Sequence, residues 1–205
     1  MERLNIEDCK RFIKGDEMTK PFLDNDFVLE KVMKDFNHKA AMGEKASKIS
    51  SLMGWIKANV KYAEDESFRA ENKFARNSQE IWESKLATGC TDYALLFATF
   101  ARQIGIPTTL LHTAERGWVE RLKTGADYNI HKGHTFCECF YENEWILVDP
   151  TFRKVEKNYN PKMLELSYIV GDSNVYVPYL RTTDFDTEQN VLKFNKKMEE
   201  LCKNL

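Results

Sequence analysis

The sequence lacks any apolar run that could cross a membrane, since no stretch approaches the roughly 18 residues that a spanning helix needs. It also lacks an excess of charge of either sign: 30 Lys and Arg stand against 32 Asp and Glu, a formal net charge of −2. Without a strong positive charge, the chain has no general attraction to nucleic acid or to an anionic lipid surface. We therefore expect neither a nucleic acid nor a membrane among its partners.

The N-terminus lacks the apolar stretch of a secretory signal, because acidic residues interrupt its opening sequence, MERLNIEDCKRFIKGDEM. We therefore expect a cytoplasmic protein. A chain of 205 residues buries enough surface to fold without disulfides or a metal. Its cysteines are odd in number, so reduced thiols are expected, and few of them can have a function. They are Cys9, Cys90, Cys137, Cys139 and Cys202.

Apolar spacing predicts helices first and strands later. Spacings of three and four predict helices over 26–36 and 46–60, and the polar stretch 61–80 reads as a loop with some helix. Residues 90–104 are apolar on nearly every side, which is typical of a helix buried in the middle of a domain. Gly105 and Pro107 end it.

The second half of the chain contains strand patterns. Five β-rich runs predict strands, PTTLLH, HTFCECFY, EWILVD, LSYIV and VYVPYL, and an amphipathic helix follows from about residue 186. Helices followed by antiparallel strands indicate an α+β domain. A long connection over 113–133 is expected to fold over the site, since connections of this length are uncommon unless functional or disordered. In it, Trp118 and Tyr128 are candidate substrate-binding residues. The alternative is that Trp118 only anchors the connection to the core.

Cys90 is the cysteine with the best position for chemistry. It follows a glycine and begins the buried helix, where the helix dipole and the unpaired N–H groups stabilise a thiolate. The thiolate is the nucleophilic form of cysteine. The plain alternative is that Cys90 is a small buried apolar residue, the usual fate of a free cysteine.

A nucleophile needs a base, and His134 begins the HTFCECFY strand. If Glu142 and Asn143 form a two-residue turn, Phe136 pairs with Asp149, which places Asp149 on the His134 face of the sheet. A three-residue loop would place Asp149 on the opposite face unless a bulge corrected it. The sequence therefore permits a Cys–His–Asp site. A strand-end histidine and a turn aspartate remain the alternatives.

A zinc site deserves consideration because His131, His134, Cys137 and Cys139 lie close together in the sequence. In a strand, however, His134 faces away from both cysteines, and the C-x-C spacing is not the usual one for zinc. We therefore expect no metal and no cofactor.

Three separated segments resemble one known family. Between about residues 55 and 152, GCTDYALLFATFARQIGIP and GHTFCECFYENEWILVDPT resemble the core of the transglutaminase-like superfamily, part of the papain-like thiol fold. One departure is Thr135, where an aromatic or small residue often follows the family's histidine. The matching residues are Cys90, Asp92, Ala94, Arg102, Gly105, Ile106, Pro107, His134, Phe136, Glu138, Trp145, Asp149, Pro150 and Thr151.

The resemblance implies an enzyme with Cys90 as the nucleophile, His134 as the base and Asp149 as its orienter. The oxyanion-stabilising residue would lie upstream of the cysteine, with Gln79 and Trp82, and also Asn77, as candidates. The backbone N–H of Cys90 is a second donor.

The implied reaction is acyl transfer from an amide of a peptide or protein substrate, through a thioester. Hydrolysis leads, as in a cysteine protease. Transfer to an amine, as in a transglutaminase, is the alternative, and glycan release from asparagine is a weaker third. A binding module with an idle cleft is the rival from another class. We expect a helical extension over 1–54, the catalytic core over 55–155, and strands and a helix over 156–205 that complete the same domain.

Overall fold

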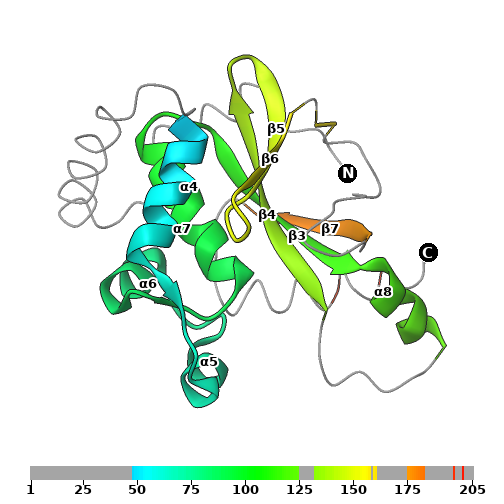
Figure 1. The fold of residues 1–205 in the computed structure, drawn as a ribbon. Helices are drawn as coiled ribbons and strands as arrows, with labels where there is room; N and C mark the ends of the chain where they lie inside the picture. The colour runs from blue at the N-terminus through cyan, green and yellow to red at the C-terminus, as the bar shows by residue number, and fades with distance from the viewer. Residues whose placement is uncertain are drawn as a thin grey trace.

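The computed structural model describes residues 48–124, 132–157, 159–160, 175–182, 196 and 200. It is an α+β fold in which the helices cluster against an antiparallel sheet (Figure 1). The helices are α4 (Lys48–Asn59), α5 (Glu66–Asn72), α6 (Ser78–Ser84), α7 (Cys90–Gln103) and α8 (Arg116–Lys123). The strands are β1 (Lys61–Tyr62), β2 (Leu86–Ala87), β3 (Thr108–Glu115), β4 (Gly133–Tyr141), β5 (Glu144–Asp149), β6 (Lys154–Glu156) and β7 (Tyr176–Thr182).

Helix α7 is the centre of the domain, as its sequence predicts. Every residue from Thr91 to Arg102 is buried, because α4 and α6 cover one side of the helix and the sheet covers the other (Figure 1). The helix ends at Gln103, and Gly105 follows its C-cap with a φ of +79°, in the left-handed region that glycine adopts without strain. The chain can then turn at once into β3, so the sheet packs directly on the helix.

The five-stranded sheet has the order β6-β5-β4-β3-β7, and all its neighbours are antiparallel. The β4–β5 hairpin has the predicted two-residue turn. Glu142 and Asn143 both have left-handed φ values, +52° and +64°, as a type I′ turn requires. Tyr141 therefore pairs with Glu144, and the register runs on to bring Asp149 opposite Phe136. This confirms the expected register.

The two faces of β4 have different surroundings. Cys137 and Cys139 face α7 and belong to the main core. Phe136 faces the other way and packs with Leu111 and Leu147 in a second cluster. Odd-numbered residues of β4 therefore face α7, and even-numbered residues, including His134, belong to the opposite face.

The prediction of a loop over 113–133 is wrong for most of the residues of this segment that the structure describes. Strand β3 continues to Glu115 and α8 follows it directly, because Val119 and Trp118 bury themselves against the sheet. Residues 125–131 lie outside the described residues, as do the predicted helix over 26–36, the LSYIV strand and most of the C-terminal helix. The short strands β1, β2 and β6 were not predicted, since two or three residues carry no periodic pattern.

The predicted boundary after residue 54 falls inside α4. Met53 and Ile56 lie on either side of it, and both belong to the main core, so the core begins before residue 55. The division into three parts otherwise stays a prediction. Among the helices that the structure describes, none combines the length and the apolar character needed to cross a bilayer.

Candidate active site

Cys90 is the first residue of α7, and the backbone leading to it is extended at Gly89 (φ 178°, ψ −168°). No side chain caps this end of the helix, so its N–H groups and the positive end of its dipole are directed towards the thiol. Cys90 is half-buried, whereas Cys137 and Cys139 are buried, and all three are free thiols. Among the described cysteines, Cys90 is therefore the accessible one.

A buried ion pair fixes the segment that precedes Cys90. The Arg76 guanidinium lies 2.6 Å from Asp92 Oδ2, and both side chains are almost fully buried. The same oxygen accepts hydrogen bonds from the backbone N–H and the hydroxyl of Thr88, at 2.8 and 3.0 Å. Arg76 also donates to the Leu86 carbonyl oxygen. The loop is thus tied to the first turn of α7, which holds Cys90 in place.

His134 has a carboxylate partner. Its Nε2 lies 3.0 Å from Asp149 Oδ2, and both residues are buried. The other carboxylate oxygen of Asp149 accepts backbone N–H groups from Thr151 and Phe152, at 2.9 and 3.1 Å. Asp149 is therefore held from both sides, and Nδ1 of His134 is left for Cys90, whose interaction with the imidazole helps to raise the pKa of His134.

The end of β5 explains how residues of β4 reach Cys90. The Phe140 N–H points to β3, where it donates to the Pro107 carbonyl oxygen. Since N–H directions alternate along a strand, the Thr135 N–H points to the β5 side. Strand β5 has already ended at Asp149, opposite Phe136, so no strand covers Thr135 on this side. In that gap the Thr135 N–H helps to lower the pKa of Cys90.

The hydroxyl of Thr135 adds a second donor to the thiol. This hydroxyl also lies 3.1 Å from the Thr91 hydroxyl on α7, and both threonines are buried. The residue that departs from the family pattern is therefore in direct contact with Cys90. The alternation of β4 already placed Thr135 on the α7 face, but nothing in the sequence related it to the thiol.

These contacts shift the pKa values of both Cys90 and His134. Burial by itself raises the pKa of Cys90, but the hydrogen bond and positive charge of His134, with the two Thr135 donors, outweigh it and lower the pKa. Burial by itself lowers the pKa of His134, but hydrogen bonds to Asp149 and Cys90 and the charges of both raise the pKa to about 10. Between the lowered Cys90 pKa and about pH 10, the pair is therefore thiolate and imidazolium.

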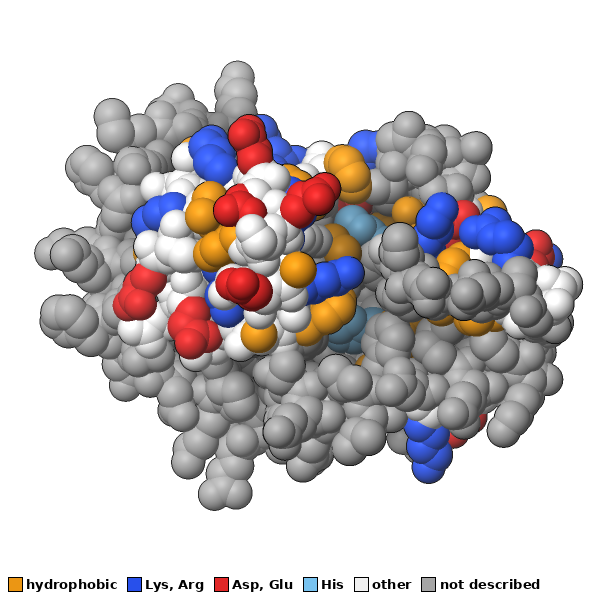
Figure 2. Space-filling view, turned by 90° about the horizontal axis from the view of Figure 1, so that it is seen from below, with side chains coloured by type: hydrophobic (Ala, Val, Ile, Leu, Met, Phe, Trp, Pro, Cys, Tyr) orange, Lys and Arg blue, Asp and Glu red, His pale blue; other side chains and the backbone are white. Residues whose placement is uncertain are grey.

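Tyr179 of β7 is a neighbour of the site that sequence analysis missed. Burial raises the pKa of its phenol, and the negative charge of Cys90 raises it further, so its ring lies near the thiol. A β7 tyrosine far away in the sequence carries no motif that could have identified it. Viewed from below, the surface is hollowed between the helices and the sheet, and histidine side chains lie in this recess (Figure 2).

The structure does not support the two upstream oxyanion candidates. Trp82 stacks on Trp55 with ring centroids 4.8 Å apart and contacts Phe100. Phe100 is ten residues after Cys90 on the same helix, which corresponds to about 15 Å. Gln79 donates to Glu83 on its own helix at 2.7 Å.

Asn77, the third upstream residue considered, caps the N-terminus of α6 through its side chain. The Asn77 and Gln79 side chains bond within α6 and the Trp82 ring packs in the core, so the Cys90 N–H remains the oxyanion donor to consider.

Trp118 packs in a cluster with Ala114, Val119 and Tyr179 and is only 7% exposed. This burial favours the anchoring alternative, although Tyr179 connects the cluster to the neighbourhood of Cys90. The substrate-binding role of Trp118 stays a prediction. Tyr128 lies outside the described residues.

Trp118→Ala should lower the melting temperature, because it empties a buried site. Truncating a buried tryptophan costs about 3–5 kcal/mol, or roughly 10 °C for a chain of this size. Thermal unfolding measures the effect, and Trp118→Phe, which keeps most of the packing, is the control. An unchanged melting temperature in Trp118→Ala, with a raised KM, would restore the substrate-binding role.

The zinc alternative finds no support in the described residues. Cys137 and Cys139 face α7, whereas His134 is directed to Asp149, and His131 lies outside the described residues. In the described part of the chain, no three His, Cys, Asp or Glu side chains gather as metal ligands.

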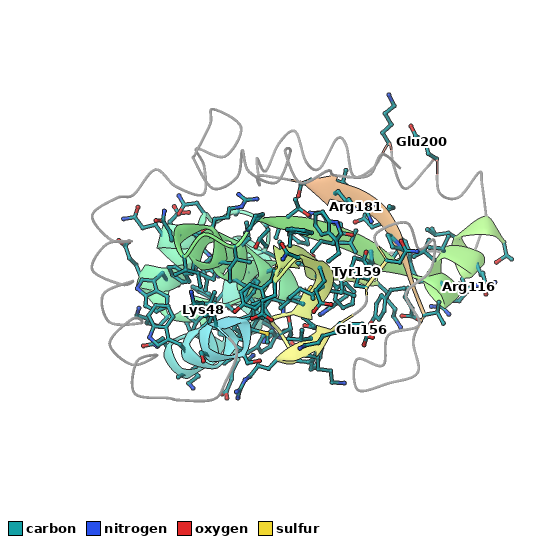
Figure 3. The ribbon with its side chains drawn as sticks, turned by 90° about the horizontal axis from the view of Figure 1, so that it is seen from above. Lys48, Arg116, Glu156, Tyr159, Arg181 and Glu200 are labelled. Atoms are coloured by element: carbon teal, nitrogen blue, oxygen red, sulfur yellow. The ribbon has the colours of Figure 1, made fainter. Side chains whose placement is uncertain are left out.

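Glu138 follows His134 on the same strand and has a structural role. Its buried carboxylate accepts two hydrogen bonds from Arg181, at 2.6 and 2.8 Å, and one from the Tyr159 hydroxyl, at 2.5 Å. Arg181 and Tyr159 come from separate segments and lie over the sheet (Figure 3). The network therefore fastens β7 and the segment around Tyr159 to the strand that carries His134.

One family model matches the chain. Residues 34–150, more than half of the chain, match the family model of the transglutaminase-like superfamily, and the match contains Cys90, His134 and Asp149. No curated protein matches the chain. A similar solved structure is that of "a Putative Cysteine Protease from Cytophaga hutchinsonii", with 14% identity and a TM-score of 0.47. That similarity covers 83% of this chain and 63% of the other.

Proposed function

The chain belongs to the transglutaminase-like superfamily, and on this basis we propose that it is a cysteine enzyme that hydrolyses amides through a thioester on Cys90. One observation carries the proposal. The partly exposed cysteine at the start of α7 has its pKa lowered by an imidazole, and a nitrogen of that imidazole lies 3.0 Å from a buried carboxylate. This is the arrangement of a nucleophile, its base and an orienting acid.

In the proposed first step, the Cys90 thiolate attacks the carbonyl carbon of the amide and forms a C–S bond. The carbonyl oxygen becomes an oxyanion, to which the Cys90 N–H donates. The His134 imidazolium then gives the proton on Nδ1 to the nitrogen of the leaving amine, and the C–N bond breaks. Asp149 keeps the ring in position and stabilises its cation until the proton has left.

In the second step, the neutral His134 takes a proton from water, and the resulting hydroxide attacks the thioester. The C–S bond breaks, the acid is released and the thiolate–imidazolium pair is restored. An amine that replaced water at this point would give transglutamination, so hydrolysis and transfer share every residue described above. We place hydrolysis first because it needs no second binding site.

One assay distinguishes hydrolysis from transfer to an amine. Casein, as a peptide substrate, is incubated with the protein and a fluorescent primary amine, monodansylcadaverine. The proposal predicts new short peptides and little fluorescence on casein, with neither product from Cys90→Ala. Fluorescent casein of unchanged length would favour the transglutaminase. Neither product, together with an ordinary Cys90 thiol, would favour the idle binding module.

Thr135→Val should weaken the thiolate without moving the backbone, because it removes the hydroxyl and keeps the N–H and the branched side chain. Loss of one hydrogen bond to a charged group should lower the alkylation rate of Cys90 at pH 6 about three- to tenfold. Iodoacetamide alkylation followed by mass spectrometry measures this rate.

The control for Thr135→Val is Thr99→Val, which removes another buried hydroxyl, one that bonds Ser78 and the Leu95 carbonyl oxygen on the opposite side of α7. It should leave the alkylation rate unchanged. Equal rates in Thr135→Val and the wild type would show that the hydroxyl contributes nothing to the thiolate.

A further inference from the structure

Phe152 is an exposed aromatic residue beside the candidate base. Its ring is 51% exposed, and its centroid lies 5.8 Å from that of His134. Among the described residues, Tyr62 is the other large hydrophobic side chain with this much exposure. The Tyr62 ring has its own partner, the Arg69 guanidinium. Single exposed apolar residues are common, so exposure by itself assigns no role to Phe152.

The backbone of Phe152 gives the second observation. Its N–H donates to Asp149 Oδ1 at 3.1 Å, next to the Thr151 N–H at 2.9 Å. The other oxygen of the same carboxylate bonds His134. The backbone of Phe152 is therefore held by the residue that orients the imidazole, which keeps the start of its side chain near His134.

The surroundings of His134 give the third observation. Among the described residues, three aromatic rings lie around the imidazole: Phe136 at 4.6 Å, Phe152 at 5.8 Å and Tyr176 at 5.9 Å. Phe136 is fully buried and Tyr176 nearly so. Phe152 is therefore the ring with apolar surface still available to another molecule, and this surface adjoins the imidazole.

We propose that Phe152 binds a bulky apolar group on the amine portion of the scissile amide. The inference rests on the proposed function, because the side of the substrate follows from the role of His134. His134 gives its proton to the leaving nitrogen, so a ring beside His134 lies next to the amine portion of the substrate and not to the acyl portion. Apolar surface that covers the exposed half of the ring is removed from water, which favours a substrate with such a group.

A matched pair of alkylating probes tests this without knowledge of the natural substrate. Iodoacetamide reports the reactivity of the thiolate alone, and N-phenethyl iodoacetamide carries an aromatic group on the amide nitrogen. In both cases the thiolate displaces iodide and forms a C–S bond. The ratio of the two rates at pH 6, divided by the same ratio for glutathione, measures how well the apolar group is bound.

The wild type should prefer the phenethyl probe about tenfold, Phe152→Ala should lose this preference, and Phe152→Leu should keep most of it. A preference that survives in Phe152→Ala, or is missing in the wild type, would overturn the proposal. Any effect of the substitution on His134 itself changes both rates and cancels in the ratio. Failure of the proposed function would look different, since iodoacetamide alone would then show no selectivity for Cys90 at pH 6.

Discussion

At pH 6, His134→Ala should lower the rate at which iodoacetamide alkylates Cys90 about a hundredfold. In the wild type, the positive charge and hydrogen bond of His134 lower the Cys90 pKa, so more of this thiol than of an ordinary thiol is ionised at pH 6. An ordinary thiol with a pKa near 8.5 is under about 1% ionised at pH 6. Because the Cys90 pKa is lowered, Cys90 has a larger fraction of thiolate than an ordinary thiol at pH values below about 8.5. This difference grows as the pH falls and disappears above about pH 8.5.

The pH dependence supplies the control for this experiment. Near pH 9.5, an ordinary thiol is itself largely ionised, so the wild type and His134→Ala should alkylate at similar rates. Asp149→Asn should give an intermediate rate at pH 6, because the imidazole remains but its cation loses a charged partner. If iodoacetamide alkylates wild-type Cys90 only above about pH 8, Cys90 and His134 do not form an ion pair. That result would favour the binding module with an idle cleft.

Arg76→Met should destabilise the protein by about 3 kcal/mol, because it leaves the buried Asp92 carboxylate without its counter-charge. For a chain of this size the melting temperature should fall by roughly 10 °C. The alkylation rate of Cys90 should fall as well, even below the melting transition, since the same carboxylate ties Thr88 to the start of α7. Thermal unfolding and alkylation measure the two effects separately.

The double variant Arg76→Met, Asp92→Asn separates charge from packing. With both charges removed, no unpaired carboxylate is buried, so part of the lost stability should return. The alkylation rate should not return to the same extent, because an amide oxygen binds Thr88 more weakly than a carboxylate does. A double variant less stable than Arg76→Met, or with wild-type reactivity, would show that the pair does not position Cys90.

The sequence predicted the buried helix that begins at Cys90 and the approach of Asp149 to His134 because each position obeys a local rule. The apolar perimeter after Cys90 indicated a buried helix, and the two-residue turn fixed the register that brings Asp149 to the His134 face. Such rules act over a few residues, so one sequence suffices to apply them.

The contacts that the sequence did not reveal join segments far apart in the chain. Arg76 is 16 residues from Asp92, and Tyr179 comes from the last described strand of the sheet. Trp82 was an oxyanion candidate because it lies upstream of Cys90, a position that does not reveal its packing against Trp55 and Phe100. Helix α8 was taken for loop although Trp118, Val119 and Leu122 have helical spacing, and burial of Trp118 and Val119 against the sheet decided its structure.

Acetylation by p-nitrophenyl acetate is the most direct test of whether Cys90 forms a thioester. The thiolate displaces p-nitrophenolate and keeps the acetyl group, which peptide mass spectrometry then locates on one cysteine. We expect p-nitrophenyl acetate to acetylate Cys90 at pH 6. The extent of acetylation should be strongly reduced in His134→Ala, and prior alkylation of Cys90 should abolish it. Burial raises the pKa of Cys137, so that thiol should stay unmodified. Acetyl groups spread over several cysteines, or absent from Cys90 at pH 6, would contradict the account.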